Sequence, residues 1–203
     1  MANEQAPSRA TQKRIMDAYI ELMQSKPYDR ITVKEIVKQA GVARSTFYLY
    51  FDSVFNLLEE IESTLSGVNV FYLRPPEKPK GWETAAESIV QWFDFCKENS
   101  VYLSTLLGVN GDTYFEERIR YHLRKEIIRM MDDDGIPHDC LRPYYIELML
   151  STHLCLMKFW LQDSQDNSIL QAEVMASMAN QLRLGAFYDT YISEVMKDSA
   201  EKS

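Results

Sequence analysis

The stretch KEIVKQAGVARSTFYLYFDS, residues 34–53, constrains the fold of this chain more than any other. Just before it, Thr32 and Glu35 have the spacing of a capping box, which predicts a short helix over residues 33–40. Gly41 suits the left-handed backbone conformation that often follows the end of a helix. The sequence therefore predicts a short helix with a defined start and a defined stop.

A second short helix, over about residues 43–50, is expected after a turn of very few residues. An amphipathic helix over residues 9–25 precedes both. Two short helices joined by a tight turn, after a longer helix, form the helix-turn-helix pattern. The alternative is a plain helical hairpin, which needs only a turn and apolar packing residues. Those packing residues are already present as Ile36, Val37, Ala40, Val42 and Phe47.

The outer face of the second short helix has an unusual composition for a face that is merely solvated. Such a face usually takes Glu, Lys and Gln, which favour helices more than Ser, Thr and paired Tyr do. No acidic residue lies between Glu35 and Asp52. Hydroxyl and guanidinium groups donate hydrogen bonds to phosphate oxygens and base edges, so this face is a candidate DNA-binding surface. Its residues are Arg44, Ser45, Thr46, Tyr48 and Tyr50.

The net charge of the chain is −8, which taken alone argues against a nucleic-acid partner. Its distribution changes that conclusion. Residues 1–56 carry eight Lys and Arg against six Asp and Glu, whereas residues 57–203 carry fourteen against twenty-four. Only the first quarter of the chain can therefore lie against a polyanion without strong repulsion.

Helical periodicity dominates the rest of the chain, and no stretch shows sustained strand alternation. The Pro-rich segment RPPEKPKG, residues 74–81, ends the fourth expected helix. Three widely spaced cysteines and a polar N-terminus predict a cytoplasmic protein without a membrane span. The fold class is therefore expected to be all-α. Further helices are expected over residues 52–71, 82–99, 100–107, 112–131, 140–161 and 168–197.

The segment ITVKEIVKQAGVARSTFYLYFDSVFNLL resembles the DNA-binding domain of the TetR family of transcriptional regulators. The matching positions are Thr32, Ile36, Ala40, Gly41, Val42, Thr46, Phe47, Tyr48, Tyr50, Phe51, Leu57 and Leu58. The resemblance implies an N-terminal three-helix helix-turn-helix domain over residues 1–51. A larger helical domain for effector binding and dimerisation follows over residues 52–203, with a helix over about residues 52–73 linking the two.

The resemblance also implies roles for individual residues. Residues 42–50 become the recognition helix of a homodimer that binds double-stranded DNA at a near-palindromic operator. Thr46, Tyr48 and Tyr50 are then expected to touch the DNA backbone, with Thr32 as a further contact. Arg44 and Ser45 are expected to reach the bases.

One position departs from the family pattern. The family commonly has Lys near the start of the fourth helix, where it binds phosphate, and this chain has Val54. Loss of one phosphate contact lowers the affinity and reduces the salt slope by about one unit. Arg9, Lys13 and Arg14, near the N-terminus, are candidates to compensate, the alternative being a frayed and solvated terminus.

The larger, acidic part is rich in aromatic residues and methionines. Core packing explains each one singly, but together they favour an apolar cavity with a few polar groups for a small apolar or aromatic effector. The candidate wall residues each pair an apolar body with a polar or polarisable group. They are Trp92, Cys96, Tyr102, His153 and Trp160.

The last two expected helices are long and apolar on more than one side. Small residues along them permit close approach, which favours a four-helix dimer interface over a purely intramolecular core. The candidate interface residues are Leu148, Thr152, Met178, Leu182, Gly185 and Ala186.

No catalytic, metal or cofactor site is expected. The sequence has no glycine-rich phosphate loop, nucleophile elbow or metal-ligand spacing. Of the three histidines, only His153 falls in an apolar helix, where a satisfied core histidine is the commoner role. The hypothesis is a ligand-responsive regulator, a repressor that a small molecule releases from its operator. The alternative is a metabolite-sensing coactivator that acts through a partner protein instead of binding DNA by itself.

Overall fold

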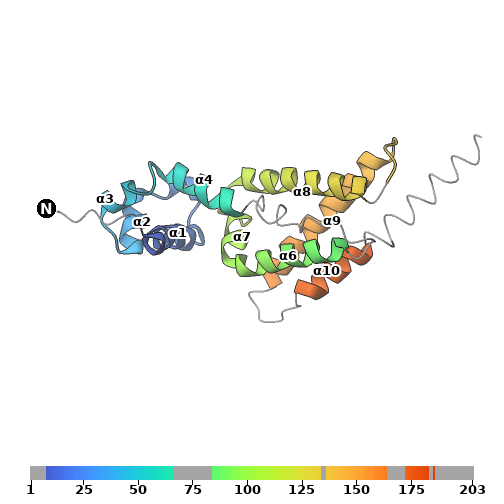
Figure 1. Cartoon of the computed structure of the whole chain (residues 1–203). Helices are drawn as coiled ribbons and strands as arrows, with labels where there is room; N and C mark the ends of the chain where they lie inside the picture. The colour runs from blue at the N-terminus through green and yellow to red at the C-terminus, as the bar shows by residue number, and fades with distance from the viewer. Residues whose placement is uncertain (1–7, 66–83, 134–135, 164–171, 183–184, 186–203) are drawn as a thin grey trace, which may run out of the picture. The chain divides into compact units, whose positions relative to one another are not determined.

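The computed structural model describes residues 8–65, 84–133, 136–163, 172–182 and 185 (Figure 1). Across these residues the secondary structure is helical and contains no strand, which confirms the expected all-α class. The chain divides into two compact units. The first unit comprises Met1–Ser66 and Val101–Glu116, and the second comprises Gly67–Ser100 and Glu117–Ser203.

The N-terminal helices of the first unit follow the predicted order. They are α1 (Arg9–Met23), the 3-10 helix η1 (Tyr28–Arg30), α2 (Val33–Ala40), α3 (Arg44–Tyr48) and α4 (Val54–Leu65). Most of the apolar face that the spacing predicted for α1 is buried, whereas Leu22 is half-buried. Burial of each large apolar side chain stabilises the unit by about 1.5–3 kcal/mol. The fully buried side chains of these helices include Ile15, Tyr19, Met23, Ile36, Phe47 and Leu57.

The predicted ends of α2 are confirmed. Both halves of the capping box between Thr32 and Glu35 form at its start. Gly41 ends the helix with φ of 62°, in the left-handed region. Arg14 of α1 donates from Nη2 to the carbonyl oxygens of Ala40 and Gly41, at 2.6 and 3.2 Å. The turn between α2 and α3 is therefore fixed both by its backbone and by a side chain from α1.

A segment far along the sequence belongs to the first unit. Helix α7 (Ser100–Leu106) and the loop after it lead into the start of α8 (Thr113–Asp133). The hydroxyl of Tyr102 donates to Asp17 of α1 at 2.5 Å, and the amide of Tyr28 donates to the carbonyl of Asn110 at 2.9 Å. Sequence patterns gave no sign of this association, because hydrophobic spacing does not say which helices pack together.

The second unit contains α6 (Thr84–Glu98), most of α8, α9 (Arg142–Asp163) and α10 (Ala172–Gln181). Helix α6 packs against both α9 and α10 (Figure 1). The rings of Phe93 on α6 and Trp160 on α9 meet edge to face, with centroids 5.5 Å apart. This aromatic contact lies in the buried interior of the unit.

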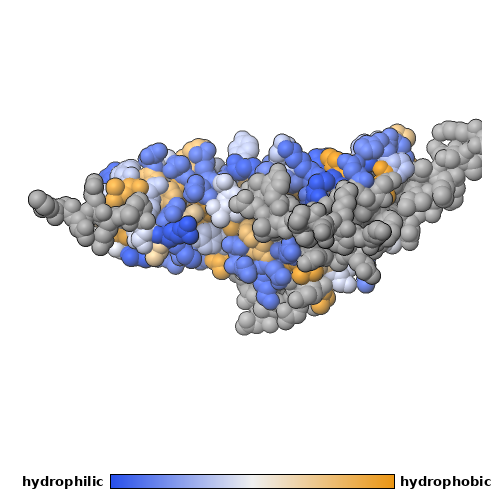
Figure 2. Space-filling model, viewed as in Figure 1, coloured by the Kyte–Doolittle hydropathy of each residue, from blue (hydrophilic) through white to orange (hydrophobic). Residues whose placement is uncertain are grey.

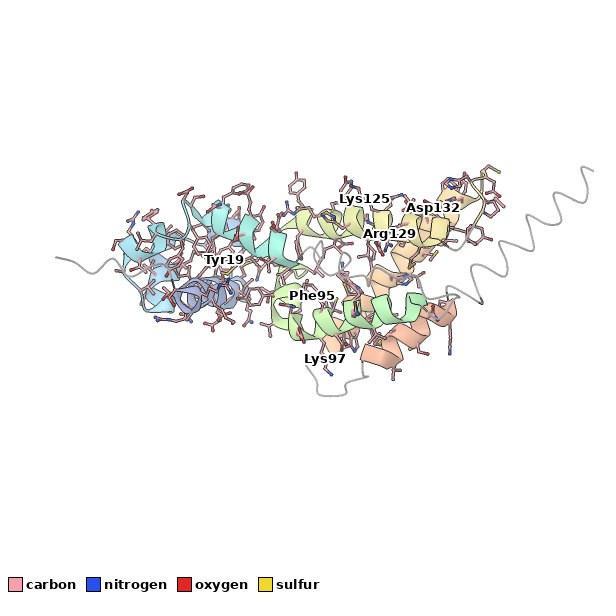
Figure 3. The ribbon with its side chains drawn as sticks, viewed as in Figure 1. Tyr19, Phe95, Lys97, Lys125, Arg129 and Asp132 are labelled. Atoms are coloured by element: carbon pink, nitrogen blue, oxygen red, sulfur yellow. The ribbon has the colours of Figure 1, made fainter. Side chains whose placement is uncertain are left out.

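A buried arginine and an exposed aspartate link the end of α8 to the start of α9. Arg142 is buried, donates to the carbonyl of Ile136 at 2.8 Å, and pairs with Asp132 near the end of α8. Asp132 lies beyond Lys125 and Arg129 along the same helix (Figure 3). The Arg142 guanidinium thereby satisfies groups that the turn would otherwise leave without partners.

Candidate nucleic-acid interface

Helix α3 buries one side chain and presents most of the others. Phe47 is completely buried and contacts the ring of Phe51. Arg44, Ser45 and Tyr48 are exposed, and Tyr48 shows 46% of its surface. Thr46, Tyr50 and Val42 are half-buried. On the face drawn in Figure 2, hydrophilic and hydrophobic residues are interspersed over the described surface of this unit.

Arg44 and Tyr48 contact each other one helical turn apart. Nη2 of Arg44 donates to the hydroxyl of Tyr48 at 3.3 Å. The guanidinium carbon also lies 5.7 Å from the centroid of the Tyr48 ring, within the range of a cation–π contact. The Tyr48 ring in turn meets the buried Phe47 ring edge to face at 5.4 Å. The exposed pair is thereby connected to the core.

Thr32 and Glu35 support the start of α2. The Thr32 hydroxyl donates to Glu35 Oε2 at 2.6 Å and accepts from the Glu35 amide at 3.4 Å. Lys26 pairs with the other carboxylate oxygen at 2.7 Å. The hydrogen bonds from Lys26 and Thr32 lower the pKa of Glu35 to about 2. Thr32 is exposed, but its hydroxyl already has a structural role, and its contact with DNA stays a prediction.

Two of the three N-terminal cations that are candidates for phosphate contacts also have partners within the protein. Arg14 is engaged at the Ala40–Gly41 turn, and Lys13 pairs with Asp17 at 2.8 Å, because each acceptor lies within reach on the folded surface. Arg9 is exposed at the first position of α1. The Tyr50 hydroxyl accepts a hydrogen bond from the amide of Ser8 at 2.7 Å. The segment just after α3 thus contacts the residue just before α1.

The start of α4 carries apolar side chains where a phosphate-binding lysine was expected. Ser53 accepts from the amide of Asn56 at 3.0 Å and caps the helix. Val54 is half-buried, whereas Phe55 next to it is 66% exposed. Leu49, at the end of α3, is 69% exposed. The side chains of Leu49, Val54 and Phe55 have no hydrogen-bond donor to offer to phosphate.

Comparison with known proteins identifies the N-terminal unit. Residues 15–61 match the family described as "Bacterial regulatory proteins, tetR family". The matched span covers α2 and α3 entirely and most of α1 and α4. The match is confined to this N-terminal part, which is therefore similar to the TetR family. This likeness to bacterial regulatory proteins agrees with the expectation of a regulator rather than an enzyme.

Two curated relatives resemble this chain over the same N-terminal part. The HTH-type transcriptional regulator YvdT of Bacillus subtilis is 42% identical over 53 residues, which is 26% of this chain and 27% of that protein. The HTH-type dhaKLM operon transcriptional activator DhaS of Lactococcus lactis is 45% identical over 51 residues, or 25% and 27% of the two chains. The alignments thus span about a quarter of each curated relative.

A solved structure resembles the fold over most of its length. The TetR transcriptional regulator from Streptococcus agalactiae aligns with a TM-score of 0.62 and 24% identity, covering 86% of this chain and 93% of that one. At this identity the likeness concerns the fold.

The candidate effector residues do not share one compact unit. Trp92, Cys96, His153 and Trp160 are buried in the second unit. Tyr102 belongs to the first unit, and its hydroxyl donates to Asp17. The wall of an effector site therefore stays a prediction.

The imidazole of His153 and the thiol of Cys96 are both accommodated by their immediate surroundings in the second unit. Nδ1 of His153 lies 2.6 Å from the carbonyl oxygen of Met149, one turn earlier on α9. This histidine is thereby accommodated in the core, as the sequence favoured. Burial raises the pKa of the Cys96 thiol well above its usual value, which keeps it in the uncharged form.

The described candidate dimer residues lie on α9, on α10 and shortly after α10. Leu148 is 53% exposed, and Met178, Leu182 and Gly185 are exposed as well. Thr152 is half-buried and donates to the carbonyl of Leu148 at 2.8 Å. Ala186 lies outside the described residues. Their role in a dimer stays a prediction.

Sequence reasoning missed the extension of this surface along α9. Tyr144 and Phe159 are both about 70% exposed, and the exposed Cys155 lies between Leu148 and Phe159. Their spacing of four and seven residues follows one helix face. The spacing was visible in the sequence, but the apolar character of every face of α9 concealed which face is exposed.

The remaining titratable groups of the described part are dispersed. Burial and the charge of Lys125 lower the pKa of His122, and His138 lies 3.0 Å from Asp132 in the loop before α9. Among the described residues, no group of three or more His, Cys, Asp and Glu side chains could hold a metal ion. None of the described helices is long and apolar enough to cross a membrane.

Proposed function

We propose that this chain is a ligand-responsive transcriptional regulator that binds double-stranded DNA through the exposed face of α3. The observation that carries the proposal is the arrangement of α3 itself. Phe47 is inserted in the core, while Arg44, Ser45 and Tyr48 face outward in a segment free of acidic residues. These side chains donate to phosphate oxygens and base edges, as a recognition helix requires.

A homodimer supplies the second half of the interface. The exposed apolar stripe of α9, together with Met178 of α10 and Leu182 just after it, fits a surface that a second copy of the chain covers. Two recognition helices then enter successive major grooves on one side of a palindromic operator, with centres about 34–36 Å apart. Both half-sites must be engaged together for tight binding.

The proposed spacing of the two recognition helices also offers a way for a ligand to control DNA binding. A small apolar or aromatic molecule bound in the second unit would shift α4 and, with it, the separation of the two recognition helices. A small displacement is enough to weaken binding to both half-sites at once. We therefore propose a repressor that its ligand releases from DNA.

The test is fluorescence anisotropy with the DNA upstream of the protein's own gene, at several salt concentrations. Tyr48→Ala removes an exposed aromatic side chain from α3 and should weaken binding at every salt concentration. Tyr114→Ala removes a similarly exposed tyrosine from the start of α8 and should leave binding unchanged. Equal affinity of the wild type and Tyr48→Ala would contradict the proposal.

A second candidate is a coactivator that acts through a partner protein. The exposed Leu49 and Phe55, beside Val54 in the place of a phosphate-binding lysine, favour it. One relative is named an operon transcriptional activator, which is the opposite sign to the repression proposed above. The discriminating experiment is whether the purified chain selects any DNA sequence from a random library without a second protein.

A further inference from the structure

The pairing of Arg44 and Tyr48 has a consequence for which base pairs the protein reads. Arg44 is the first residue of α3, and the N-terminal residues of a recognition helix contact base edges. Its side chain is held on one side by the hydroxyl and the ring of Tyr48, rather than being paired with a carboxylate. A guanidinium held in this way keeps its remaining N–H donors in a fixed fork.

We propose that Arg44 reads a guanine in each half-site, by donating two parallel hydrogen bonds to O6 and N7, and that Tyr48 is the positioning residue for its guanidinium. Guanine is the base whose major-groove edge offers two adjacent acceptors, and arginine is the side chain that matches them most often. This inference rests on the proposed function, since it concerns the same surface.

The role of Tyr48 follows from how its own ring is held. The ring meets the buried Phe47 edge to face, so its position is set by the core and not by solvent. An arginine on an exposed helix otherwise samples many rotamers, and fixing it costs entropy at the moment of binding. Contact with the Tyr48 ring, which is already in place, reduces this entropy cost and orients the N–H donors of the Arg44 guanidinium.

The alternative role for Arg44 is a contact with phosphate. The two roles differ in what they do to sequence preference. A phosphate contact strengthens binding to all sequences about equally and adds about one unit to the salt slope. A bidentate base contact instead confers a preference at one position of each half-site.

The experiment begins with DNA selected from a random library by the full-length chain. Each conserved guanine of the selected site is then replaced by 7-deazaguanine, which removes the N7 acceptor and leaves the base pair intact. For the wild type, we expect the affinity to fall about tenfold or more at one guanine per half-site. Arg44→Gln should bind more weakly and should no longer distinguish guanine from its 7-deaza form at that position.

Lys38→Gln is the control for loss of charge. Lys38 is exposed on α2 of the same unit, so its replacement removes one positive charge without touching the Arg44–Tyr48 pair. The discrimination against 7-deazaguanine should persist in this variant. Equal discrimination in the wild type and Arg44→Gln would overturn the assignment of Arg44.

Tyr48→Phe tests the positioning role. It keeps the ring and removes the hydroxyl. In the wild-type background it should reduce the discrimination between guanine and 7-deazaguanine. In Arg44→Gln it should leave that discrimination unchanged. A change in overall affinity with unchanged discrimination would overturn the role of Tyr48. Selection of no DNA sequence at all would overturn the proposed function too, whereas a selected site without any deaza-sensitive guanine would overturn this inference alone.

Discussion

The two units of the molecule differ in how directly the sequence determines their functional surfaces. In the first unit, a capping box, one glycine and a short apolar pattern define α2 and α3 and leave a polar face exposed. In the second unit, apolar residues surround α9, so the pattern predicts the helix but not its partners. Local sequence signals can therefore predict a surface that a single helix forms. A surface formed by several helices depends on how those helices pack together.

The largest expected effect tests the core under the interface. Phe47→Ala should destabilise the first unit by about 3–5 kcal/mol, because it removes a completely buried ring and leaves a cavity. Hydrogen–deuterium exchange of the α1–α3 amides should report this loss. Phe55→Ala, at an exposed phenylalanine of the same unit, should change stability by less than about 0.5 kcal/mol. Similar effects of the two substitutions would contradict the described packing.

The next prediction concerns the surface of the second unit. Leu148→Asp places a charge in the centre of the exposed stripe on α9 and should weaken self-association by about 2–3 kcal/mol, roughly a hundredfold in Kd. Analytical ultracentrifugation measures this change. Val109→Asp, at a fully exposed position of the first unit, should leave the oligomeric state unaltered. If Leu148→Asp dimerised as tightly as the wild type, α9 would not be part of the dimer interface.

A smaller effect is expected at the turn between α2 and α3. Gly41→Ala forces an L side chain into a left-handed conformation, which should cost about 1–2 kcal/mol. The nearest atom to the added carbon would be Arg14 Nη2 at 3.6 Å, so the cost arises from the backbone and not from a clash. Thermal unfolding should show a milder effect for Gly41→Asn, since Asn tolerates this region better. Equal stability of Gly41→Ala and the wild type would contradict the strained turn.

The smallest effect is the pH dependence of the capping box. The pKa of Glu35 is lowered to about 2, so its ionised form stabilises the fold above pH 4.5 and loses this contribution as the pH falls from 4.5 towards 2. Glu35→Gln should therefore be less stable than the wild type at pH 7. The difference should shrink in denaturant titrations at progressively lower pH. A difference that grows on acidification would be inconsistent with the capping role.

Much of the fold could be predicted from the sequence because its signals are local. The bounds of α2 were predicted exactly, and α6, α7, α8 and α9 lie close to the expected ranges. The C-terminal end of the last expected helix lies outside the described residues. The short η1 helix was not predicted, because Pro27 indicated only a break.

The contacts between distant segments could not be predicted in the same way. Tyr102 stays a predicted residue of an effector site, but its hydrogen bond to Asp17 of α1 was not foreseen. Arg14 was a candidate to compensate for the missing phosphate-binding lysine, and its contact with the Ala40–Gly41 turn was not foreseen either. In both cases the polar group has a partner that lies close only after folding, which residue spacing along the chain does not reveal.

Dimethyl sulfate protection of guanine N7, on DNA selected by the purified chain, tests most directly whether α3 enters the major groove. We predict protected guanines in two successive major grooves, centred about 10 base pairs apart on one side of the duplex, with the protection lost in Tyr48→Ala. Guanines that stay reactive under saturating protein, or protection that Tyr48→Ala leaves intact, would contradict the account.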